Sequence, residues 1–66
     1  MTLRINGEDR AGVQAETVAE LVAELGLPAQ VILVEHNDVA LRRAEWAERL
    51  LQEGDRLEMI RIVAGG

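Results

Sequence analysis

The chain has 66 residues, a formal net charge of −5 and no cysteine. A chain this short forms one small domain, which has too little interior to enclose a large active site. The lack of cysteine excludes disulfide frameworks, thiolate metal sites and cysteine nucleophiles. The acidic charge and the single aromatic residue, Trp46, argue against nucleic-acid binding, which uses basic surfaces and aromatic stacking.

No apolar run approaches the roughly 20 residues that a membrane-spanning helix requires. The first residues also lack the basic start and apolar stretch of a secretory leader. We therefore expect a cytoplasmic protein with no membrane contact.

The first part of the chain predicts a β-hairpin. Apolar and polar residues alternate from Met1 to Asn6, which indicates a strand with one buried face. Asn6-Gly7 is typical of a hairpin turn because both residue types tolerate positive φ. We expect the second strand over residues 9–14, with Gly12 marking a bulge or a weak edge.

A helix is predicted to begin after Thr17, whose hydroxyl can cap the first free N–H groups. Glu20 lies three residues later, where its side chain can complete a capping box. One apolar stripe follows at helical spacing, formed by Val18, Leu21, Val22 and Leu25. Gly26 and Pro28 then predict the end of the helix.

Residues 31–34 form a short, continuous apolar run, Val-Ile-Leu-Val. Such a run predicts a central strand that is covered on both faces. After a polar turn at residues 36–38, residues 39–41 are expected to form a short edge strand.

Residues 43–51 predict irregular structure or one helical turn around Trp46, with Leu50 and Leu51 returning to the core. Residues 56–63 then predict the last strand. The whole order, strand–strand–helix–strand–strand–strand, predicts a two-layer α+β domain over residues 1–63. Residues 64–66 are expected to form a flexible Gly-Gly tail.

Six short motifs in this order resemble the ThiS branch of the ubiquitin-like sulfur-carrier family over essentially the whole chain. They are Ile5-Asn6-Gly7, residues 17–21, residues 34–37, residues 43–46, residues 54–58 and Ala64-Gly65-Gly66. The chain departs from the family at Arg42, where proline is usual, and at Glu16, where glycine is common. The resemblance implies a ubiquitin-like β-grasp fold, with a mixed sheet of about five strands packed on one helix.

The resemblance also implies chemistry at Gly65 and Gly66, because the family works through its C-terminal carboxylate. A ThiF-like adenylating enzyme would use ATP to activate Gly66, and a sulfur donor would convert it to a thiocarboxylate. A ThiG-like thiazole synthase would then use that sulfur in thiamin biosynthesis. The chain would be a protein cosubstrate without a bound cofactor, and a monomer when free.

Two alternatives to this function remain. One is a carrier for another pathway, such as a MoaD-like protein of molybdopterin synthesis. The other is a plain β-grasp interaction domain whose terminal glycines are incidental, since chain ends are often rich in glycine.

The last predicted strand provides a candidate docking surface for a partner. If Leu57 and Met59 face the core, strand alternation places two isoleucines on the opposite face, beside the tail. The residues of this predicted surface are Glu58, Ile60, Ile62, Val63 and Ala64. The alternative is that the Trp46 segment or another copy of the chain covers these side chains.

The other conspicuous residues are expected to be structural. Trp46 is predicted to anchor its loop on the sheet, and Arg42-Arg43 to hold the adjacent turn. His36 is the only histidine and lies in a polar sequence, so we expect it to be solvated. A solvated helix face is predicted for Glu16, Glu20 and Glu24.

Overall fold

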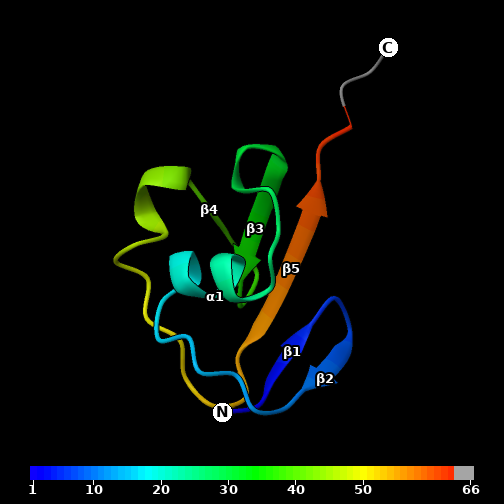
Figure 1. Cartoon of the computed structure of the whole chain (residues 1–66), viewed down its shortest axis with the longest axis vertical. Coiled ribbons are helices and arrows are strands. Elements are labelled where there is room, and N and C mark those ends of the chain that lie inside the picture. Colours follow the sequence, from blue (N-terminus) through cyan, green and yellow to red (C-terminus); the bar gives the residue numbers. More distant parts are fainter. Residues whose placement is uncertain (64–66) are drawn as a thin grey trace.

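A computed structural model describes residues 1–63 of the chain (Figure 1). Within these residues it contains five strands and one α-helix, in the predicted order, and two short 3-10 helices. The strands are β1 (Leu3–Ile5), β2 (Glu8–Arg10), β3 (Ile32–His36), β4 (Val39–Leu41) and β5 (Arg56–Arg61). The helices are α1 (Val18–Glu24), η1 (Ala29–Val31) and η2 (Arg43–Glu45).

The five strands form one mixed sheet in the order β2-β1-β5-β3-β4. β1 and β5 are parallel, whereas the other three neighbouring pairs are antiparallel. α1 follows the β1–β2 hairpin and packs on one face of the sheet (Figure 1). This arrangement confirms the predicted two-layer α+β class and makes β5 the central strand.

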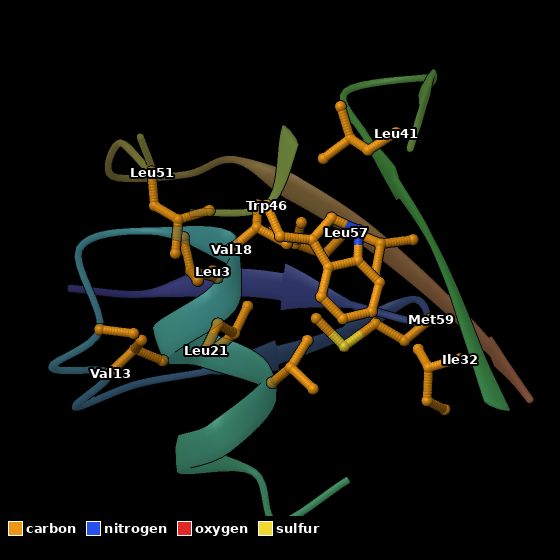
Figure 2. Packing of buried hydrophobic residues seen from close by; sticks show 13 residues of the cluster. Leu3, Val13, Val18, Leu21, Ile32, Leu41, Trp46, Leu51, Leu57 and Met59 are labelled. Atoms are coloured by element: carbon orange, nitrogen blue, oxygen red, sulfur yellow. The ribbon is translucent and has the colours of Figure 1, made fainter. Parts of the chain in front are cut away.

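The core lies between α1 and the sheet. Its most completely buried side chains come from α1 and from three strands: Leu3, Val18, Leu21, Val34 and Leu57. Trp46 belongs to the same cluster, as Figure 2 shows, and its predicted role as an anchor is confirmed. The Arg43 guanidinium lies 4.9 Å from the centroid of the Trp46 ring, and its Nη1 donates to the Ala29 carbonyl. Arg43 therefore holds its segment as expected.

The start of α1 is fixed by the side chains that the sequence indicates, with one difference. Thr17 Oγ1 accepts a hydrogen bond from the Glu20 N–H at 3.2 Å. The Glu20 carboxylate, however, accepts from the N–H of Glu16 at 2.8 Å, so the capping box closes one residue earlier than predicted. Glu24 accepts from the N–H of Ala15 at 2.8 Å. Glu16, Glu20 and Glu24 are exposed, as the predicted solvated helix face requires. Glu20 and Glu24 also bind the backbone of the loop that enters the helix, which was not expected for Glu24.

Three strand predictions need correction. β5 ends at Arg61 instead of residue 63. β2 covers Glu8–Arg10 instead of residues 9–14, because the chain leaves the sheet at Gly12 (φ +74°) to reach α1. β3 begins at Ile32 and only one of its faces is covered. Leu33 is 51% exposed, since a single helix layer covers one side of this sheet and not the other.

The segment after β4 contains the predicted single helical turn, η2, and returns Leu51 to the core. The prediction for Leu50 was wrong, because its side chain is 66% exposed. Leu50 forms an isolated antiparallel bridge with Thr17, and in extended chain two consecutive side chains point to opposite sides. Only one of the two leucines can therefore reach the core.

Candidate functional site: the outer face and end of the central strand

β5 carries the chain from the core to its C-terminal end (Figure 1). It is hydrogen-bonded on both sides, to β1 and to β3, so its position is well defined by the sheet. The predicted site residues Ala64, Gly65 and Gly66 lie outside the described residues. The structure describes the chain up to Val63 and the surface around that point.

The face of the sheet opposite α1, here called the outer face, has an apolar patch next to this end. Ile60 and Ile62 are each 48% exposed, as strand alternation predicts. Leu33 lies directly across from Ile60 in the β3–β5 register. These three residues, Leu33, Ile60 and Ile62, are named the apolar patch.

Trp46 packs in the core on the opposite side of the sheet, so the Trp46 segment does not cover the patch. Val63 follows it and is also exposed. Sequence reasoning missed Leu33, although its alternation with Ile32 and Val34 was a usable signal.

The other end of the outer face is charged. Arg4 and Arg56 occupy paired positions in β1 and β5, and each binds an aspartate: Arg4 binds Asp9 at 3.1 Å, and Arg56 binds Asp38 at 2.8 Å.

Glu35 and Glu58 are direct cross-strand partners next to the apolar patch. Within residues 1–63 neither forms an ion pair. Two like charges directly opposite each other are unfavourable in an isolated sheet. The pair places two negative charges side by side at the border of the apolar patch.

His36 is not solvated, and the prediction for it was wrong. It is the last residue of β3 and only 5% exposed. Its Nε2 lies 2.6 Å from Asp55 Oδ2, and Arg49 Nε donates to its Nδ1 at 2.8 Å. Because an arginine only donates, Nδ1 accepts and the ring proton sits on Nε2, which donates to Asp55.

Asp55 is the centre of this buried network. Burial alone would raise its pKa, but hydrogen bonds from His36, the Asn37 amide and the Gln52 N–H together hold the pKa of Asp55 below its usual value. The network joins the end of β3 to the turn that starts β5. It has little contact with solvent and fixes the start of β5 relative to β3.

Comparison with known proteins identifies the family. The model of the ThiS family matches residues 3–66. The chain belongs to the ThiS family. The predicted family is thereby confirmed, and the match includes the terminal glycines.

Relatives and solved structures agree with this assignment. The crystal structure of the thiamine biosynthesis protein (ThiS) from Geobacter metallireducens has a TM-score of 0.86 and 30% identity, and each chain is covered completely. This likeness confirms the β-grasp fold. The sulfur carrier protein ThiS of Thermus thermophilus is 31% identical over 62 residues, which are 94% of this chain and 95% of that protein.

Longer proteins also match. A thiazole synthase of Paramagnetospirillum magneticum is 35% identical over all 66 residues, but these are only 20% of its length. The chain thus spans about one fifth of the length of the thiazole synthases that it matches.

Two kinds of site have no candidate in the described part of the chain. No helix there is long and apolar enough to span a bilayer. No group of three or more His, Asp or Glu side chains within residues 1–63 is placed to hold a metal ion.

Proposed function

We propose that this chain carries sulfur as a thiocarboxylate on Gly66 and delivers it for thiazole formation in thiamin biosynthesis. The observation that carries the proposal is the family match, which extends through Gly66. The Thermus thermophilus relative named as a sulfur carrier is covered over almost its whole length, which supports the same function.

The proposed chemistry begins at the carboxylate of Gly66, which is ionised at neutral pH because an α-carboxyl has a pKa of about 3.5. In a ThiF-like enzyme this carboxylate attacks the α-phosphate of ATP, which releases pyrophosphate and gives an acyl-adenylate. A sulfur nucleophile from the donor then attacks the carbonyl carbon, and AMP leaves. Transfer of the sulfur to the thiazole precursor returns Gly66 to a carboxylate.

The chain itself supplies presentation in this scheme, and the enzymes supply the catalysis. The central position of β5 gives the C-terminal residues a fixed origin, and Gly65 lacks the Cβ that would hinder entry into a narrow channel. The apolar patch lies next to this origin and offers the hydrophobic centre of a docking surface. Glu35 and Glu58 add negative charge at its border, which suits a basic partner surface.

We propose two enzyme partners, a ThiF-like adenylating enzyme and a ThiG-like thiazole synthase, and a cytoplasmic setting. The match to two thiazole synthases supports the second partner, because each contains a segment similar to this chain within a longer protein. When the two activities share one polypeptide, the carrier is held near the enzyme that uses its sulfur.

Intact mass spectrometry tests the proposal. The 66-residue chain is incubated with ATP, a sulfide source and a ThiF-like enzyme. We expect the mass to rise by the difference between a sulfur and an oxygen atom, and to stay unchanged without ATP. A variant with one alanine added after Gly66 is the matched control, since its carboxylate is displaced by one residue. A mass that never changes in the wild-type chain would contradict the proposal.

A further inference from the structure

A second feature lies at the end of β5, on the side of the sheet that faces α1. It is a cleft of about 290 Å³ between the β1–β2 hairpin, the C-terminal end of α1 and the ends of β3 and β5. Its walls are apolar, with Leu25, Leu27, Ile32 and Met59 among them. Two exposed arginines, Arg10 and Arg61, also line it.

The cleft exists because β1 separates from β5 at this point. The two strands pair only at Arg4–Arg56 and Ile5–Leu57, and the chain then turns at Asn6 (φ +50°). At the next position the Asn6 side chain makes the hydrogen bonds that a β1 backbone would otherwise make to Met59. It accepts from the Met59 N–H at 2.7 Å and donates to the Met59 carbonyl at 3.2 Å. Beyond Met59, β5 has no β1 neighbour, and the gap between hairpin and helix stays open.

The positive charges that line the cleft have no acidic residue beside them in its walls. Of the seven basic residues, all arginine, Arg4, Arg42 and Arg56 pair with carboxylates. Arg43 lies over Trp46, and Arg49 binds His36.

Among the seven arginines, only Arg10 and Arg61 have neither an ion pair nor a side-chain hydrogen bond within residues 1–63. Both line this cleft. No Asp or Glu lines it. In a chain of net charge −5, the cleft is therefore a local region of positive charge.

We propose that this cleft receives an apolar side chain flanked by a carboxylate, which belongs to the enzyme that binds the C-terminal residues. The apolar side chain enters between Leu25 and Met59, and the carboxylate pairs with Arg10 and Arg61. This inference rests on the proposed function, because that function brings an enzyme to the end of β5.

The size and the position of the cleft both favour a side-chain anchor. Pockets for small molecules span about 300–1,000 Å³, so a cleft of about 290 Å³ is at the lower limit and suits one or two side chains better than a nucleotide. Arg61 is the last residue of β5 and lines the cleft, and Ile62 of the apolar patch follows it directly. An enzyme that covers the apolar patch and takes the C-terminal residues therefore also reaches the cleft.

The four isoleucines of the chain provide a direct test. Ile5 and Ile32 line the cleft, whereas Ile60 and Ile62 belong to the apolar patch. In a protein labelled with carbon-13 at the isoleucine δ1-methyl groups, a ThiF-like enzyme is titrated in and the four signals are followed by NMR. We expect both pairs to shift or broaden. Changes confined to Ile60 and Ile62 would overturn the inference and leave the proposed function standing.

Charge removal gives the second arm of the test. The double variant R10Q/R61Q should bind the enzyme about five- to tenfold more weakly, the effect expected for two partly exposed ion pairs. The affinity of Arg61→Gln alone for the enzyme is compared with that of Arg42→Gln. The second variant is the control, because it removes the same charge from an arginine outside the cleft.

A general attraction between this acidic chain and a basic enzyme predicts the opposite sign, since each of these variants makes the chain more negative. Equal or tighter binding of R10Q/R61Q, with sulfur loading of the wild-type chain intact, would contradict the cleft and not the carrier function. Failure of the wild-type chain to be loaded would contradict the carrier function itself.

Discussion

Both faces of β5 carry large apolar side chains, but these lie in opposite surroundings. Leu57 and Met59 point toward α1 and are buried, whereas Ile60 and Ile62 point away and are 48% exposed. The difference does not come from hydrophobicity, because all four are large apolar residues. It comes from the single helix layer, which covers one face of the sheet and leaves the other exposed. If the outer face docks a partner as proposed, alternate residues of one chain segment serve stability and docking.

The largest difference between the two faces is expected in what their leucines contribute to the free energy of unfolding. Leu57→Ala removes a fully buried side chain and should lower the free energy of unfolding by about 3 kcal/mol. Leu33→Ala, on the outer face, should lower it by less than about 1 kcal/mol. Urea unfolding of both variants measures the two values. Similar losses would mean that the outer face also contributes to the core.

The second prediction concerns the network that positions the start of β5. Asp55→Asn leaves the hydrogen bonds from His36, Asn37 and Gln52 without their carboxylate, so we expect a loss of about 2 kcal/mol in the free energy of unfolding at pH 7. The apolar patch is not altered by this change. Urea unfolding again gives the value, and a loss below about 0.5 kcal/mol would show that the network is dispensable.

The same network predicts a pH dependence. The folded protein lowers the pKa of Asp55 below its usual value of 3.8, so its contribution to stability is complete above pH 3.8 and is lost as the pH falls through the folded pKa. Unfolding experiments below pH 3.8 should therefore show a steeper loss for the wild-type chain than for Asp55→Asn. Identical slopes would mean that other carboxylates dominate acid unfolding.

The smallest effect on stability is expected on the outer face. Ile60→Glu should change the free energy of unfolding by less than about 0.5 kcal/mol, because Ile60 is half exposed. It should nevertheless weaken binding to the adenylating enzyme about tenfold or more, since it places a charge at the centre of the patch.

Val39→Glu is the matched control for this variant, because Val39 is a β-branched strand residue with 46% exposure, two strands away from β5. Equal binding by the two variants would remove the apolar patch as a docking surface.

The outer face of β5 could be predicted because strand alternation needs only the sequence and one buried neighbour. Leu33 follows the same rule, but the continuous apolar run around it favours a strand buried on both sides. His36 and Asp55 could not be paired in advance. They are 19 residues apart, and their contact depends on the β3–β5 register.

The cleft was even less accessible to sequence reasoning. Its arginines come from β2 and β5, and its opening depends on where β1 leaves β5, which no local pattern indicates. Capping side chains were located to within one residue, as with Glu20, because capping is a local interaction. What the sequence could not supply was the set of contacts between distant segments.

The location of the transferred sulfur tests the central claim most directly. After incubation with ATP, a sulfide source and the adenylating enzyme, the protein is cleaved after Arg61 and the masses of its peptides are measured by mass spectrometry. We predict that the peptide of residues 62–66 alone gains the mass difference between sulfur and oxygen, with fragmentation assigning it to Gly66. Sulfur found elsewhere in the chain, or an unchanged terminal peptide, would contradict the account.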